Sequence, residues 1–182
     1  MGLPKEKIYT AEEFFAITPD NNSERYELYD GEIVALAAPS IGHQRLLGNL
    51  FFKFKEFINR KKCKCEPFIS PCDVMLDDEN VVQPDMFILC DPSKLDSSRC
   101  NGAPDFVIEI ASSNRSNDFI RKLALYERFG VHEYWIVDLL HERTVVYCLD
   151  ESHSPNIYTI DSDIPVEMYK GELTVNIKEI ME

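Results

Sequence analysis

Residues 105–138 read DFVIEIASSNRSNDFIRKLALYERFGVHEYWIVD, and this run predicts a strand, a crossover helix and a second strand. The first seven residues are almost all apolar, which is typical of a central strand covered on both faces. The helix is expected over residues 116–129, with Ser116 as its N-cap and Gly130 as its C-terminal stop. Such a unit indicates two parallel strands in one sheet.

The rest of the chain predicts antiparallel strands and two more helices around that unit. These elements are a short helix over 10–17 capped by Thr10 and Glu13, a hairpin over 25–37 that turns at Asp30-Gly31, a long helix over 43–60 capped by Ser40, strands within 65–70, 72–76 and 81–90, a strand pair over 133–138 and 143–149, and weaker strands within 156–180. Together they predict an α/β sandwich around a mixed sheet. We expect all 182 residues to form one domain, with a core over about residues 9–150 and a C-terminal strand extension over 151–182.

The net charge of the chain is −13, from 19 Lys and Arg against 32 Asp and Glu. An acidic surface repels phosphate backbones, so the composition argues against a protein that coats nucleic acid non-specifically. The composition does not exclude an enzyme that binds nucleic acid in a local cleft, where a metal ion neutralises the negative charge of the protein. Basic residues cluster locally, for example at Arg60-Lys61-Lys62.

The sequence indicates a cytoplasmic protein without a membrane partner. Its first residues contain no apolar signal-peptide segment, and no run of about 18 apolar residues occurs. In a reducing compartment the six cysteines are expected to be free thiols. Cys63 and Cys65 have no second pair of ligands at suitable spacing, so a zinc site is not expected.

The clearest anomaly is Glu109, which interrupts the apolar run 106–110. By strand alternation it shares a face with Val107 and Ala111. Burying a carboxylate without a partner costs several kcal/mol, so a Glu in a central strand needs a cation, a metal ion or a hydrogen-bonding network. A half-exposed Glu at the strand end, or one paired with an Arg, is the alternative.

Asp85 and Lys122 complete a candidate site around Glu109. Asp85 follows Pro84, which belongs at the start of a strand, so Asp85 is expected at the mouth of the buried strand that follows. Lys122 lies on the crossover helix, from which it could reach the C-terminal end of the Glu109 strand. The alternatives are an Asp in an ordinary turn and a solvated Lys paired with Asp118.

Two neighbouring carboxylates and one ammonium are the parts of a metal-dependent phosphodiesterase. Close carboxylates raise each other's pKa, and a divalent cation removes that penalty. Mg²⁺ takes one or two protein carboxylates together with waters and substrate phosphate. A bound metal provides a more nucleophilic water, while a nearby Lys orients that water or stabilises the charge that develops around phosphorus.

A series of motifs runs along the chain: YELYDGE from Tyr26, APS leading to HQ at His43, VVQPD ending at Asp85, GAPDFVIE ending at Glu109, KLALYER from Lys122, then GV at Gly130 and EYWIVD from Glu133. Together these motifs resemble the Uma2 family, formerly DUF820, of the PD-(D/E)xK nuclease superfamily. They occur in the family's order and cover roughly residues 9–150. The resemblance implies a restriction-endonuclease-like α/β fold, in which helices flank a mixed central sheet and a hairpin lies near the N-terminus.

The resemblance also implies roles for individual residues. Asp85 and Glu109 match the metal ligands of the superfamily, and the backbone carbonyl of Ile110 is implied as a further ligand. The superfamily's Lys usually follows two residues after the acid, where this chain has Ala111. Lys122 matches the Lys that Uma2-like sequences supply from the following helix.

Glu27 and His43 are supporting candidates. Glu27 takes the opposite face of its strand from Tyr26 and Leu28, and it resembles the accessory acid of such nucleases. His43 begins the long helix, whose N-terminus attracts phosphate, so it could contact substrate or relay a proton. A capping or loop histidine is the alternative.

The sequence therefore predicts an endonuclease that hydrolyses DNA with Mg²⁺ or Mn²⁺. Asp85 and Glu109 would bind the metal, and Lys122 would assist the attacking water. RNA is an alternative substrate, and self-association, most simply as a homodimer, would extend the footprint of a small domain. The competing hypothesis is a nuclease fold kept for assembly or regulation, which the charge of −13 favours.

Overall fold

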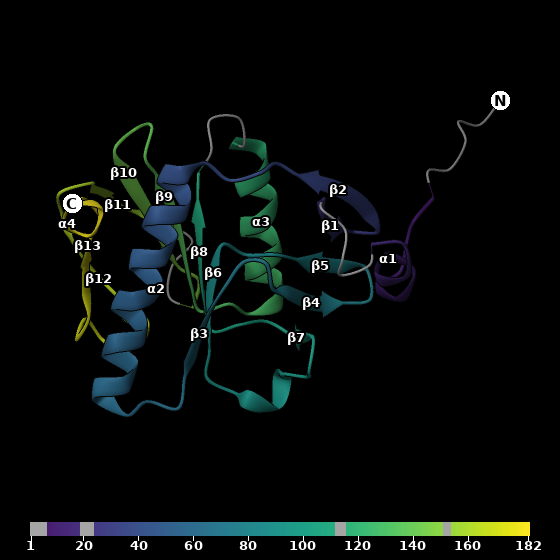
Figure 1. The fold of residues 1–182 in the computed structure, drawn as a ribbon, viewed down its shortest axis with the longest axis horizontal. Coiled ribbons are helices and arrows are strands. Elements are labelled where there is room, and N and C mark those ends of the chain that lie inside the picture. Colours follow the sequence, from purple (N-terminus) through teal and green to yellow (C-terminus); the bar gives the residue numbers. More distant parts are fainter. Residues whose placement is uncertain (1–6, 19–23, 112–115, 151–153) are drawn as a thin grey trace.

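Figure 1 shows the computed structural model of the chain, which describes residues 7–18, 24–111, 116–150 and 154–182, with only the backbone for 116–118. In chain order the elements are α1 (Ala11–Ile17), β1 (Arg25–Tyr29), β2 (Glu32–Leu36), α2 (Ile41–Lys61), β3 (Glu66–Ile69), β4 (Asp73–Asp77), β5 (Asn80–Val82), β6 (Met86–Leu89), η1 (Pro92–Lys94), β7 (Arg99–Asn101), β8 (Phe106–Ile110), α3 (Ser116–Phe129), β9 (Glu133–Asp138), β10 (Arg143–Cys148), β11 (Asn156–Thr159), β12 (Asp163–Pro165), η2 (Glu167–Tyr169), β13 (Thr174–Asn176) and α4 (Ile177–Met181).

A six-stranded mixed sheet, in the order β11-β10-β9-β8-β6-β3, forms the middle layer. One face packs against α2 and α4 through a core that includes Phe54, Phe106 and Trp135. The other face packs against α3 and the five-stranded sheet β2-β1-β5-β4-β7 through a core that includes Val107 and Tyr126. Figure 1 shows β6 and β8 between α2 and α3. This layer is the expected mixed central sheet flanked by helices.

The crossover unit folds as the sequence predicts. β8 and β9 pair in parallel, and every residue of β8 is buried. Ile108 and Ile110 face the α2 side, while Val107 belongs to the core on the α3 side. By alternation Glu109 also faces α3, so this strand brings a carboxylate under the crossover helix.

The five-stranded sheet is an addition that the sequence did not predict. β5 pairs with β1 and β4, whereas β6 pairs with β3 and β8, so the chain changes sheets between β5 and β6. The change takes place at residues 83–85, where Pro84 has no amide to donate to a ladder. β7, for which no strand was predicted, joins the same sheet by parallel pairing with β4.

The helix caps agree with the predicted signals. Thr10 and Glu13 form a capping box at α1, and Ser40 Oγ accepts a hydrogen bond from the His43 amide at 3.2 Å. α2 therefore begins at Ile41, two residues before the predicted start. At the end of α3, Gly130 has a φ of 77°, a left-handed conformation that favours glycine. The predicted cap of α3 at Ser116 lies outside the described side chains.

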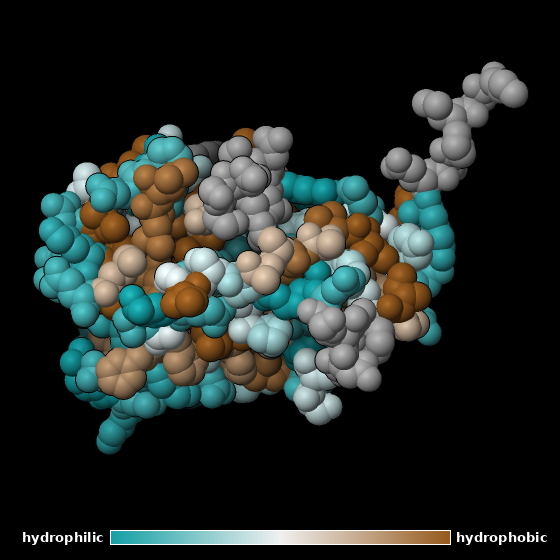
Figure 2. Space-filling view, turned by 45° about the horizontal axis from the view of Figure 1, so that its top comes forward, coloured by the Kyte–Doolittle hydropathy of each residue, from teal (hydrophilic) through white to brown (hydrophobic). Residues whose placement is uncertain are grey.

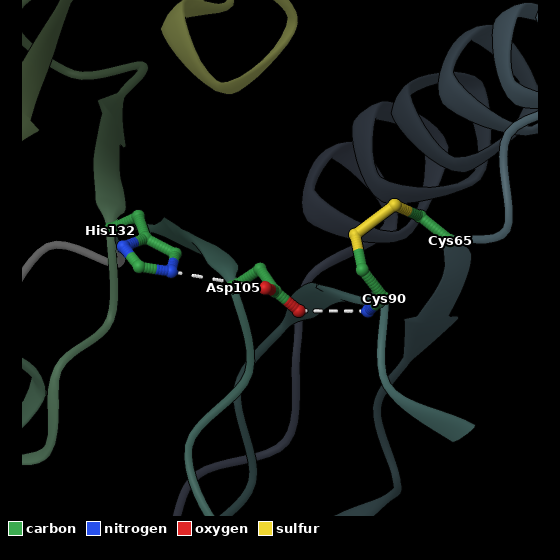
Figure 3. The surroundings of a disulfide bond; sticks show 4 residues. All are labelled: Cys65, Cys90, Asp105 and His132. Atoms are coloured by element: carbon green, nitrogen blue, oxygen red, sulfur yellow. Dashed lines mark hydrogen bonds and ion pairs between the residues drawn. A yellow bond between two sulfur atoms is a disulfide. The ribbon is translucent and has the colours of Figure 1, made fainter. Parts of the chain in front are cut away.

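Cys65 and Cys90 form a disulfide, so the expectation of six free thiols is wrong for this pair. Cys65 precedes β3 and Cys90 follows β6, and the antiparallel pairing of these strands brings the two residues together. Figure 3 shows Asp105 beside this disulfide. Its carboxylate accepts a 2.7 Å hydrogen bond from the Cys90 amide and lies 3.9 Å from His132 Nε2, so it connects the end of β6 with the segment before β9. Cys63, Cys72 and Cys100 are free cysteines.

The C-terminal segment is attached through Glu133, which is 1% exposed. Its carboxylate accepts hydrogen bonds from Trp135 Nε1 at 2.7 Å and from the amides of Glu167 and Met168 at 3.2 and 2.9 Å. Burial raises the pKa of Glu133, against these three hydrogen bonds. Across the described ranges, no helix is long and apolar enough to cross a membrane.

Candidate active site

The candidate site lies at one end of the strands of the six-stranded sheet, where β8 ends and β6 begins. The start of α2, the end of β8, the start of α3 and the β9–β10 turn are all at the top of Figure 1. β6 runs antiparallel to β8, with Met86 opposite Ile108, so Asp85 lies beside the last residues of β8. His43 reaches the same end from the first turn of α2.

Lys122 is buried between two carboxylates. Its Nζ lies 2.8 Å from Glu109 Oε1 and 3.1 Å from Glu27 Oε1, and its side chain is only 2% exposed. Tyr126 OH donates to Glu109 Oε1 at 3.0 Å, and Tyr29 OH donates to Glu27 Oε2 at 2.6 Å. Lys122 is therefore not a solvated surface lysine, and Glu109 is not half-exposed.

This cluster joins four separate parts of the chain, namely β1, the segment 83–85, β8 and α3. Lys122 and Tyr126 are four residues apart on α3 and so share one face of the helix. Glu27 comes from β1, and its Oε1 also accepts a 2.8 Å hydrogen bond from the Gln83 amide. Buried polar contacts therefore connect the β1–β2 hairpin, the segment 83–85 between the two sheets, β8 and α3.

The pKa of Glu109 is set by burial and by the charges around it. Burial raises the pKa of Glu109 to about 8; Lys122 lowers it in part, while Asp85 and Glu27 raise it further. Burial lowers the pKa of Lys122, but Glu109 and Glu27 outweigh this effect and hold that pKa well above its usual value. Lys122 thus contacts two carboxylates, and Asp85 is a further negative neighbour of Glu109.

Asp85 is held by two hydrogen bonds to a single oxygen. Its Oδ2 accepts from the Ile110 amide at 2.8 Å and lies 2.9 Å from His43 Nε2. The amide and carbonyl of one strand residue point to the same side, so the Ile110 carbonyl also faces Asp85. This carbonyl has no ladder hydrogen bond from β6, because β6 pairs with β8 only as far as Ile108.

A cavity of about 320 Å³ opens beside Asp85 and Ile110. Arg25, Ser40 and His43 contribute polar groups to its wall. The Arg25 guanidinium donates to the Ala37 carbonyl at 3.2 Å, which holds this side chain along the segment that leads into α2. Figure 2, which turns the top of Figure 1 forward, shows hydrophobic and hydrophilic residues interspersed on this face.

The oxygen atoms at this end of the strands are of the kind that a hard divalent cation prefers. Over the described ranges, no group of three or more His, Cys, Asp or Glu side chains is gathered to hold a metal. Mg²⁺ needs only one or two carboxylates besides waters and substrate phosphate. The hydrogen bonds given above use Oδ2 of Asp85 and Oε1 of Glu109, so the second oxygen of each carboxylate, together with the Ile110 carbonyl, supplies a set of oxygen donors.

Sequence reasoning missed the residues that support the candidate cluster. Tyr126 follows Lys122 at helical spacing, and Tyr29 lies two residues after Glu27 on one strand face, so spacing alone could have found both. Arg25 has no such signal, because its place in the cavity wall depends on how the hairpin meets α2.

A mixed sheet between two helical layers, with acidic residues at one end of its strands, is the restriction-endonuclease-like arrangement that the motifs implied. The Uma2 family, described as "Putative restriction endonuclease", matches residues 11–175, so the chain belongs to this family. A crystal structure of "a putative nuclease belonging to DUF820" from Anabaena variabilis is similar, with a TM-score of 0.78 and 19% sequence identity over 94% of this chain and 97% of that chain. No curated protein matches the sequence. The expected family and fold are confirmed.

Proposed function

We propose that this protein is an endonuclease that hydrolyses phosphodiester bonds of DNA and depends on Mg²⁺ or Mn²⁺. The observation that carries the proposal is that Asp85 accepts a 2.8 Å hydrogen bond from the Ile110 amide beside a cavity, while Glu109, one residue before Ile110, lies 2.8 Å from Lys122. Membership of the Uma2 family supports a nuclease function.

Asp85, Glu109 and the Ile110 carbonyl would hold the metal ion. When bound, such an ion makes water more nucleophilic at neutral pH and shields the charge of the phosphate. The negative charge around Glu109 favours binding, because a divalent cation would relieve the repulsion from Asp85 and Glu27.

The remaining residues would position these ligands. Lys122 stays protonated, so it acts as a cation and hydrogen-bond donor that fixes Glu109 and stabilises charge developing on the phosphate. Glu27 holds Lys122, and His43 holds Asp85. Hydrolysis adds the water's oxygen to phosphorus and breaks one P–O bond, leaving a phosphate monoester on one fragment and a hydroxyl on the other.

The proposal takes residues 1–182 as one domain that works in the cytoplasm. One site cuts one strand, and a homodimer would bring a second site to the other strand. Sedimentation velocity measures this state directly. A dimer with and without DNA is the expected result.

A non-catalytic role for the same fold is the second candidate, and the net charge of −13 favours it. Proteins that act on DNA usually show basic surfaces, since each neutralised phosphate adds affinity. In this alternative the buried Glu27–Lys122–Glu109 cluster only stabilises the fold, and neither metal nor DNA binds.

Titration calorimetry with Mn²⁺, together with nicking of supercoiled plasmid, tests the proposal. Asp85→Asn and Glu109→Gln keep the size of each side chain but remove its charge. Both variants are expected to lose metal binding and nicking. Glu56→Gln, an exposed residue of α2, removes the same charge away from the site and should leave both activities unchanged.

Cleavage that persists in both variants would reject these carboxylates as the active site. Metal binding without cleavage of DNA or RNA by the wild type would reject the nuclease proposal. Absence of both binding and cleavage would favour the non-catalytic alternative.

A further inference from the structure

The cavity beside Asp85 has one polar and one apolar wall. The polar wall is formed by Arg25, Ser40 and His43 next to Asp85. The apolar wall combines Pro39, on the segment leading into α2, with residues of the β9–β10 turn. A cavity with both kinds of wall suits a ligand that has a charged part and a flat apolar part.

The apolar wall includes a residue that folding alone does not explain. Leu139 packs partly against the main core, but Leu140, beside it in the turn, is 68% exposed. Large exposed apolar side chains at the mouth of a cavity are typical of a surface that contacts a ligand.

The polar wall suits a phosphate. The Arg25 guanidinium has five donors, and the structure assigns one of its nitrogens to the Ala37 carbonyl, so further donors remain for a ligand. Arg25 and Asp85 line the same cavity, so a phosphate beside Arg25 would lie close to the proposed metal ligands. A base attached to that phosphate would then reach the apolar wall.

The geometry points to an unpaired nucleotide as the occupant of this cavity. An intact duplex keeps its bases stacked inside and is bound mainly through phosphates by several Lys and Arg residues. This chain has a net charge of −13, and one Arg is the only Lys or Arg that lines the cavity among the described residues. An unpaired base can instead leave the stack and lie against apolar or aromatic side chains.

We propose that the cavity binds one unpaired nucleotide next to the scissile phosphate, with its base against Pro39 and Leu140 and its phosphate toward Arg25. The volume of about 320 Å³ is near the lower end of ligand pockets, which suits a ligand of the size of one nucleotide. This inference rests on the proposed nuclease function and names its substrate class: single-stranded nucleic acid, including the unpaired parts of bubbles and flaps.

The test compares end-labelled single-stranded, bubble-containing and fully paired oligonucleotides of one sequence, in DNA and RNA versions, with Mn²⁺. We expect single-stranded and bubble substrates to be cut at least about tenfold faster than the duplex, since removing an apolar side chain such as Leu140 from water contributes about that factor or more. The rates on DNA and RNA show which backbone is the substrate. Binding of the same oligonucleotides, followed by fluorescence anisotropy with Ca²⁺ in place of Mn²⁺, gives a readout independent of cleavage.

Leu140→Ser tests the apolar wall, because an exposed turn residue can be changed without disturbing the core. We expect kcat/KM on single-stranded substrate to fall by about tenfold and residual duplex cleavage to be unchanged. Phe52→Ser is the matched control, since Phe52 is also 68% exposed but does not line the cavity. Arg25→Gln should raise KM for unpaired substrate more than it lowers kcat.

The outcomes separate this inference from the nuclease proposal. Equal cleavage of duplex and single strand, unaffected by Leu140→Ser, would overturn the inference and leave the nuclease proposal intact. Binding of unpaired oligonucleotide that depends on Leu140, without cleavage, would reject the nuclease proposal and support the nucleotide site. Neither binding nor cleavage of unpaired substrate would reject the inference outright.

Discussion

The buried ammonium of Lys122 lies 2.8 and 3.1 Å from the carboxylates of Glu109 and Glu27. Lys122→Met removes the cation and leaves both carboxylates buried without it. Breaking a buried ion pair from one side costs about 3–5 kcal/mol, so the urea midpoint should fall sharply. The double variant Glu27→Gln/Lys122→Met should recover part of this loss, because one uncompensated charge is gone. Equal stability of Lys122→Met and the wild type would show that the cluster is not ionised as described.

Glu109 should make the stability of the metal-free protein depend on pH. Its pKa is about 8 in the folded state against a usual 4.5, so between these values the folded state holds a proton that the unfolded state has released. The contribution to stability is complete below pH 4.5 and is lost as pH rises through 8. Thermal melting in EDTA should show Tm falling over this window, with a smaller fall in Glu109→Gln. A parallel decline in both proteins would assign the effect to other groups.

The Cys65–Cys90 disulfide connects β3 and β6, the two strands at one edge of the central sheet. It closes a loop with a sequence separation of 25, for which chain entropy gives a stabilisation of about 3.5 kcal/mol. Cys65→Ser/Cys90→Ser should therefore lower the free energy of unfolding by about this amount under oxidising conditions. Cys63→Ser/Cys72→Ser changes two free cysteines and serves as the control. If the two double variants unfold alike, the disulfide does not form in solution.

The elements and pairings that belong to one local motif were predictable, and pairings between separate motifs were not. The caps at Thr10 and Ser40 follow from side chains close in sequence. Glu109 was detectable because a carboxylate in an apolar strand has a high energetic cost. By contrast, β7 and the Cys65–Cys90 disulfide depend on which distant strands become neighbours, and no local pattern encodes that register.

The candidate site shows the same division. A crossover helix packs back on its sheet, so the sequence predicted that Lys122 could reach the Glu109 strand. The two side chains do form an ion pair. Glu27 lies on the other side of Lys122 because β1 belongs to the separate five-stranded sheet. The sequence did not predict that sheet, so it did not predict this contact. The functional roles of these residues stay predictions that the variants above address.

On the scale of the whole molecule, the charge of −13 means that any added cation should stabilise the fold to some degree by screening repulsion. A specific site adds a term that depends on the ligand, equal to about 2.7 kcal/mol at a concentration 100 times Kd. MgCl₂ should therefore raise Tm above the value in KCl of the same ionic strength. In Asp85→Asn/Glu109→Gln the two salts should act alike, although this variant has two fewer negative charges than the wild type. General screening predicts no difference between the two salts once the ionic strength is matched. If MgCl₂ still raised the Tm of the double variant above its value in KCl, the metal would bind away from these carboxylates.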